Sequence, residues 1–203
     1  MHDGQMPLFS FEGRVPDVSP AAWIAPTATL VGDVRVEEEA SIWYGAVLRA
    51  DFGPIVVRRG ANVQDGCILH GGPDPVTEVG EGATVGHLCV VHGAVIGAEA
   101  LVGNGATLLD GAVVGRRALV AAGGTVPPGM VIAEGMVAAG VPARIVGESP
   151  AEPSSGWTRI RRSTASWPGG TRPESGPSRG WPAPELTGYH RPDVAGSRRA
   201  SQA

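Results

Sequence analysis

Aliphatic residues recur every six positions through most of the chain, and this period limits the possible folds more than any other feature of the sequence. A period of six differs from the 3.6 residues of an amphipathic helix and from the two-residue alternation of an ordinary strand. It is typical of an all-β parallel β-helix built from hexapeptide repeats. The repeating positions are Ile24, Leu30, Val36, Ile42, Leu48, Val57, Val63, Leu69, Val79, Val85, Val91, Ile96, Val102, Leu108, Val114, Val120, Val126 and Ile132.

A small residue follows most of these aliphatic residues by four positions, as Ala46, Ala61 and Ala106 illustrate. In a hexapeptide β-helix three hexads form one triangular coil, and successive coils stack at the strand spacing of roughly 4.8 Å. The pattern therefore predicts that the aliphatic side chains fill the prism, while the small residues fit beside its corners.

Two interruptions divide the repeat. Residues 49–56 add about three residues to one coil, and residues 71–78 add about four to the next. Both segments contain Pro and Gly, which predicts loops that leave a corner of the prism. Loops on a rigid scaffold commonly carry functional residues.

The repeat also divides the chain into three parts. Residues 1–22 are predicted to form an N-terminal lead-in and cap, and residues 23–147 the β-helix domain. Residues 148–203 are rich in Pro, Gly, Ser and Arg and lack the hexad pattern. Such a composition predicts a disordered tail.

Composition excludes several functional classes. A net charge of −4 gives no strong attraction to nucleic acid or to an anionic membrane. Cys67 and Cys89 stand where other repeats place Ala or Val, so we expect small buried hydrophobic side chains rather than a disulfide. The sequence has no apolar run long enough to span a bilayer and no pattern of a signal peptide, so we expect a cytoplasmic protein.

Histidines at related repeat positions give the clearest functional indication. Counting hexads and skipping the interruptions places Arg49, His70 and His92 in one column on successive coils. The rings of His70 and His92 should then lie roughly 5 Å apart, the spacing of neighbouring strands. Two imidazoles at that spacing can share one zinc-type ion, with Zn–N distances of about 2.0–2.1 Å.

The third histidine falls in a different column. His87 follows Tyr44 and Asp65 on the preceding face, so one chain would not bring all three rings together. A cyclic trimer would solve this, because His87 of one subunit could meet His70 and His92 of its neighbour. Three protein ligands would leave the fourth zinc position open for water, as in catalytic zinc sites.

Several motifs are more specific than the hexad repeat, and together they resemble the gamma-class carbonic anhydrase family. The resemblance covers roughly residues 20–147. The matching segments are residues 41–51 (SIWYGAVLRAD), residues 62–66 (NVQDG) with His70, residues 85–87 (VGH), residues 91–93 (VHG), residues 109–112 (LDGA) and residues 140–144 (GVPAR).

The resemblance implies a left-handed β-helix homotrimer that binds zinc, iron or cobalt at each subunit interface and hydrates CO2 to bicarbonate. It assigns His70 and His92 of one subunit and His87 of the next as metal ligands. It implies that Gln64 hydrogen-bonds the water on the metal and that Asn62 lies near the same site. It further implies an ion pair between Arg49 and Asp65 across the interface, supported by Asp51.

The sequence departs from the active members of that family in two respects. Asp51 is followed by Phe52-Gly53-Pro54, and the loop after His70 has only Asp74 and Glu78 as acids, so the glutamates of the family's proton shuttle are missing. The family's long terminal helix is not visible in the tail. Two alternatives therefore remain: a hexapeptide-repeat acyltransferase or CoA-thioester hydrolase, and a weakly active or structural metal-binding homologue.

Overall fold

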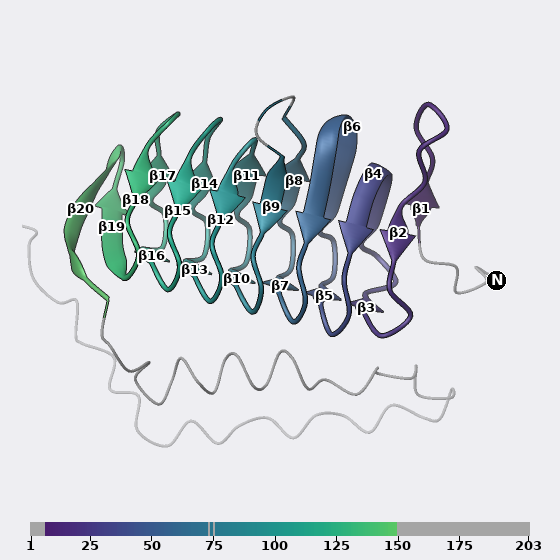
Figure 1. The fold of residues 1–203 in the computed structure, drawn as a ribbon, viewed down its shortest axis with the longest axis horizontal. Coiled ribbons are helices and arrows are strands. Elements are labelled where there is room, and N and C mark those ends of the chain that lie inside the picture. Colours follow the sequence, from purple (N-terminus) through teal and green to yellow (C-terminus); the bar gives the residue numbers. More distant parts are fainter. Residues whose placement is uncertain (1–6, 73, 75, 150–203) are drawn as a thin grey trace, which may run out of the picture. The chain divides into compact units, whose positions relative to one another are not determined.

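The described part of the chain is a left-handed parallel β-helix, and it confirms the all-β prediction. A computed structural model describes residues 7–72, 74 and 76–149, and within these ranges it contains twenty strands and no helix. The coils follow one another as a row of stacked arrows in Figure 1. The predicted tail lies outside the described residues from position 150 onward.

Each coil contributes one strand to each of three faces, which we name by two of their strands. The β8–β11 face and the β9–β12 face form one 12-stranded sheet, because β4 and β6 bend around the corner between them. The β8–β11 face contains β1 (Leu8–Phe9), the first parts of β4 (Thr29–Val36) and β6 (Val47–Val57), β8 (Ile68–His70), β11 (Val90–His92), β14 (Thr107–Leu108) and β17 (Thr125–Val126). The β9–β12 face contains β2 (Asp17–Val18), the second parts of β4 and β6, β9 (Thr77–Val79), β12 (Val95–Ile96), β15 (Val113–Val114) and β18 (Val131–Ile132).

The third face is a separate 8-stranded sheet. This β7–β10 face contains β3 (Trp23–Ile24), β5 (Ser41–Ile42), β7 (Asn62–Val63), β10 (Thr84–Val85), β13 (Leu101–Val102), β16 (Leu119–Val120), β19 (Met136–Gly140) and β20 (Ala143–Glu148). Its strands are parallel except for β20, which turns back antiparallel to β19 and ends the described prism.

The interior matches the hexad prediction. All of the predicted aliphatic positions are buried, and the corner alanines are inaccessible or nearly so. Burying a side chain such as Leu69 contributes about 1.5–3 kcal/mol. Cys67 and Cys89 are also buried and unpaired, and their thiols donate to the carbonyl oxygens of Gly86 and Gly103. The cysteines are therefore small core residues, as predicted.

The first interruption of the repeat lies within a strand and not in a loop. The register between β4 and β6 passes from Gly32 opposite Ala50 to Val34 opposite Ile55, so the extra residues are accommodated between these two pairs. All of Val47–Val57 is β-strand, and the prediction of a loop over residues 49–56 is wrong. The backbone remains extended because β6 pairs with β4 and β8 before the insertion and with β4 and β9 after it.

The second interruption joins β8 to β9, and residues 73 and 75 within it lie outside the described residues. Gly71 packs directly on the neighbouring insertion, where an added Cβ would lie 1.8 Å from the carbonyl oxygen of Gly53. Only glycine permits this close approach. The two insertions therefore stack on each other beside His70.

The N-terminal residues form a further coil. β1 and β2 both pair in parallel with β4, and a turn closed by Phe11 and Arg14 joins them. Within the described ranges, no helix has the length and apolar character needed to cross a bilayer.

Candidate functional site

His70 and His92 lie side by side at the ends of β8 and β11. The parallel register pairs His92 with His70 and His70 with Arg49, which confirms the predicted column. The His70 and His92 ring centroids are 4.7 Å apart, with the ring planes tilted by 59°. His70 Nδ1 and His92 Nε2 face each other at 2.8 Å.

Carboxylates bind the outer nitrogens of both rings. His70 Nε2 donates to Asp51 Oδ1 at 2.9 Å, and His92 Nδ1 donates to Asp110 Oδ1 at 2.7 Å. A neutral imidazole carries one N–H, and each ring uses it on its carboxylate. The two nitrogens that face each other are then both lone-pair acceptors, an arrangement that only a cation or a shared proton can satisfy.

Asp51 connects this pair to Arg49, with which it forms an ion pair. Partial burial alone would raise the pKa of the Asp51 carboxyl, but the hydrogen bond from His70 and the charge of Arg49 hold that pKa below its usual value. Asp51 therefore stays ionised at neutral pH and continues to accept the His70 proton.

The repeat columns did not predict a role for Asp110. This residue follows β14 and lies in register with Gly93 rather than with His92, so it belongs to the neighbouring column. Its motif, Leu109-Asp110-Gly111, is one of the segments that carry the family resemblance. A search for carboxylates diagonal to each histidine would have found it.

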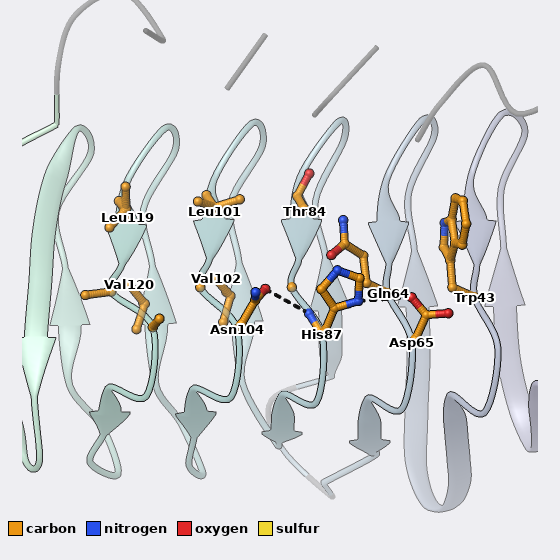
Figure 2. A pocket seen from close by; sticks show the side chains of 14 residues that line it. Trp43, Gln64, Asp65, Thr84, His87, Leu101, Val102, Asn104, Leu119 and Val120 are labelled. Carbon is orange, nitrogen blue, oxygen red and sulfur yellow. Dashed lines mark hydrogen bonds and ion pairs between the residues drawn. The ribbon is translucent and has the colours of Figure 1, made fainter. Parts of the chain in front are cut away.

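His87 lies at a different corner, after β10, where the chain passes from the β7–β10 face to the β8–β11 face. The predicted column is confirmed, since β5, β7 and β10 are in register and place Tyr44, Asp65 and His87 on successive coils. His87 Nδ1 lies 3.0 Å from Asp65 Oδ2, and the His87 backbone N–H donates to Asn104 Oδ1 at 3.1 Å. Figure 2 shows His87 between these two side chains.

A single chain thus provides two imidazoles at one corner and one at another. Among the described residues of this chain, no cluster of three or more His, Cys, Asp or Glu side chains is arranged to hold a metal ion. The expected Arg49–Asp65 pair is likewise not formed within the chain, because Arg49 pairs with Asp51 and Asp65 with His87. That pair was expected between subunits and stays a prediction.

Asn62 begins β7, and Gln64 follows that strand. Asn62 is 4% exposed; its Nδ2 donates to Ser41 Oγ at 2.8 Å, while its Oδ1 has no hydrogen-bond partner among the described residues. An unpaired buried amide oxygen costs about 1–3 kcal/mol. Gln64 lies beside His87 in Figure 2. Gln64 therefore lines the site beside His87, whereas Asn62 Oδ1 is buried beneath the surface.

A groove of about 430 Å³ runs along the outside of the β7–β10 face from Gln64 and His87. One end is polar and includes Gln64, Asp65 and His87, with the Trp43 ring beside them. The other end is apolar and includes Leu101 and Leu119 (Figure 2). The groove is within the size range of small-molecule sites, about 300–1,000 Å³.

Two solved structures share both this fold and a related sequence. The chain is 36% identical to a Bacillus cereus protein described as a "putative acetyltransferase", with a TM-score of 0.76, covering 79% of this chain and 93% of the other. It is 31% identical to a hexapeptide transferase family protein from Anaplasma phagocytophilum, with a TM-score of 0.68, covering 78% and 92%. The chain belongs to this hexapeptide-repeat, transferase-like family.

Among curated proteins, the chain is similar to the carnitine operon protein CaiE of Escherichia coli O157:H7. The two are 47% identical over 105 residues, which are 52% of this chain and 54% of CaiE. The chain thus spans about half the length of the curated relatives it matches. No family model matches the sequence.

Proposed function

We propose that the chain is a gamma-class carbonic anhydrase-like metalloprotein that reversibly hydrates CO2 at the subunit interfaces of a homotrimer. One observation carries this proposal. His70 Nδ1 and His92 Nε2 face each other at 2.8 Å while both outer nitrogens donate to carboxylates. Imidazoles whose outer N–H groups bind carboxylates are typical of zinc sites in proteins.

The pair fits a zinc-type ion, with Fe²⁺ and Co²⁺ as alternatives that imidazole also accepts. Two nitrogens bound to one tetrahedral zinc at 2.0–2.1 Å are about 3.3 Å apart. The observed separation of 2.8 Å would have to open by about half an ångström, which small rotations of the two rings supply.

His87 of a neighbouring subunit would supply the third ligand. Its ring is half exposed, with 50% of the side-chain surface accessible, so it is free to meet a second chain. Asp65 orients the ring through Nδ1 and leaves Nε2 for the metal. Three ligands leave one position open, as in catalytic zinc sites.

When bound, such an ion supplies Lewis-acid activation of water, lowering the pKa of that water to about 7. The chain's own residues would bind and orient the reactants. The Gln64 amide beside His87 would hold a bound water or bicarbonate in place, and the buried Asn62 would lie behind it. Arg49 paired with Asp65 of a neighbouring subunit would fix the two chains in register.

The proposal is tested by metal content and by stopped-flow CO2 hydration on zinc- and iron-loaded protein. We expect about one metal ion per chain and a rate above the buffer background that is lost on chelation. Metal without a rate would leave a structural metal-binding homologue, and absence of bound metal would refute the site.

A second function is favoured by the groove. Its apolar end is larger than CO2 requires, and its polar end holds a histidine oriented by a carboxylate, the arrangement of a general base. The similarity to a Bacillus cereus "putative acetyltransferase" points in the same direction. The alternative is therefore acyl transfer from, or hydrolysis of, a CoA thioester, with His87 as base and the acyl chain along Leu101 and Leu119.

His92→Ala separates the two functions. Carbonic anhydrase activity requires both His92 and His87, whereas acyl transfer requires His87 alone. If His92→Ala keeps thioester turnover and His87→Ala abolishes it, the acyl-transfer function is correct. If both variants lose CO2 hydration and the wild-type protein turns over no thioester, the hydration function is correct.

A further inference from the structure

We propose that Asp110 is the positioning residue for His92, and that residue 93 is glycine because the Asp110 carboxylate needs the space. This inference rests on the metal site proposed above. It assigns a role to two residues outside the three histidines, and it explains how an exposed imidazole is held in one orientation.

The contact itself is short and well directed. His92 Nδ1 donates to Asp110 Oδ1 at 2.7 Å, closer than the 2.9 Å between His70 Nε2 and Asp51 Oδ1. The His92 side chain is 38% exposed and the His70 side chain 18%. His70 is therefore held by its surroundings as well as by Asp51, whereas the orientation of His92 depends more strongly on Asp110.

Gly93 provides the space for this contact. Asp110 is in register with Gly93, and its carboxylate leans across that position toward the His92 ring. A Cβ added to Gly93 would lie 2.8 Å from Asp110 Oδ1, too close for a real contact. Because that oxygen is at the end of a side chain, it would move away and break its bond to His92.

The backbone alone does not require glycine at this position. Gly93 has a φ of 54°, in the left-handed region. Leu88, Glu99 and Arg117 adopt φ values of 59°, 58° and 54° at other turns of the same prism. Side chains are thus tolerated in this conformation here, and the contact with Asp110 distinguishes position 93.

The consequence for His92 is a fixed tautomer. With its proton on Nδ1, His92 presents the Nε2 lone pair to His70, which is the form that a metal ion binds. Loss of such an outer hydrogen bond typically costs 10–100-fold in metal affinity. We expect a loss of about that size for Asp110→Ala and for Gly93→Ala.

Two measurements on the full chain test the inference. The first is ¹⁵N NMR of the imidazoles of metal-free protein at a pH where they are neutral, which reports the tautomer of His92. The second is Zn²⁺ affinity by competition with a chelator. The variants are Asp110→Ala, the conservative Asp110→Asn, and Gly93→Ala.

Matched controls separate positioning from general damage. Gly123→Ala places a side chain at a φ of 67° with no atom within 4 Å of the new Cβ, so it carries the backbone strain without the clash. Asp33→Ala removes an exposed carboxylate of β4 that forms no hydrogen bond or ion pair with His70 or His92. We expect both controls to keep the wild-type tautomer and Zn²⁺ affinity, and Asp110→Asn to recover part of what Asp110→Ala loses.

The outcomes are distinct. The inference holds if wild-type His92 carries its proton on Nδ1 and both Asp110→Ala and Gly93→Ala abolish this preference. It is overturned if these variants keep the tautomer, or if Gly93→Ala behaves like Gly123→Ala. If the wild-type tautomer is as expected but no Zn²⁺ binds, the positioning role stands and the proposed metal function fails.

Discussion

The two histidine-bearing corners of the prism have the same type of backbone but different surroundings. At the corner after β8 and β11, His70 and His92 face each other and each binds a carboxylate. At the corner after β10, His87 is the single histidine; it pairs with Asp65, is half exposed and lines a groove. The first corner resembles a metal site with one protein ligand missing. The second corner offers a single histidine that could be that ligand.

Under the proposed function, this difference means that neither corner of a single chain is a complete metal site. A repeat scaffold places side chains in columns along one chain, and columns at different corners cannot converge. Convergence requires a second copy of the prism, with one corner of each chain against the other corner of its neighbour. The following predictions test whether the two corners are halves of one site.

Removal of a ligand from the paired corner should have the largest effect. His92→Ala leaves His70 as the single imidazole at that corner, so we expect bound zinc to fall from about one ion per chain to near zero. The loss should exceed the 10–100-fold that an outer hydrogen-bond partner costs. Elemental analysis of purified protein measures it, with His190→Ala as control. Full metal retention in His92→Ala would show that this corner is not a metal site.

Complementation between subunits should give the next largest effect. His87→Ala and His92→Ala chains should each be inactive alone. In mixed trimers, a site is intact when a His87→Ala chain supplies His70 and His92 and its neighbour supplies His87, which random association gives for about one quarter of interfaces. Co-expression followed by metal analysis and CO2 hydration measures the recovery. A mixture as empty as either parent contradicts the shared site.

Part of this site could be predicted from the sequence and part could not. The pairing of His70 with His92 was predictable, because a slip of one residue would turn Leu69 and Val91 out of the core. The contact between His92 and Asp110 was not predictable, because the strand register determines the backbone position of a residue but not the conformation of its side chain. Gly93 has no side chain, and the carboxylate of Asp110, its partner on the next coil, occupies that space and reaches His92 in the adjacent column.

The two insertions also show what the sequence could not predict. Their lengths were read from the breaks in the aliphatic period, but the first was expected to leave the corner as a loop. The structure instead continues β6 through Asp51 and Phe52, because backbone pairing on both sides of the insertion holds the strand. Local Pro and Gly predicted a loop, and tertiary pairing overrode that preference.

Shortening a core side chain beneath either corner should lower the free energy of unfolding. Leu69 lies under His70 and Val85 precedes His87, and both side chains are fully buried. We expect Leu69→Ala to lower the free energy of unfolding by about 2–5 kcal/mol. Val85→Ala should cost less, because fewer carbons are removed. Denaturant unfolding measures both, and a stable Leu69→Ala variant would argue against a continuous core.

The third corner, between the β9–β12 and β7–β10 faces, carries ion pairs instead of histidines and should give the smallest effect. Arg58 binds Glu78 through two hydrogen bonds and Glu37 through a third. Partial burial alone would raise the pKa of the Glu37 carboxyl, but hydrogen bonds from Arg58 and from the Arg59 backbone N–H lower it below 4.5. The contribution of Glu37 to stability is therefore complete above about pH 4.5 and lost as the pH falls through the lower folded-state value.

Glu37→Gln should consequently lower the free energy of unfolding by at most about 1 kcal/mol at pH 7, the range for solvent-exposed ion pairs. The difference from wild type should shrink as the pH is lowered below 4.5 and should also shrink in high salt. Glu12→Gln, which neutralises an exposed glutamate in the turn between β1 and β2, is the control for loss of charge alone. If the difference in the free energy of unfolding stayed constant across this pH range, Glu37 would stabilise the corner by packing rather than by charge. The three corners would then differ only in their histidines.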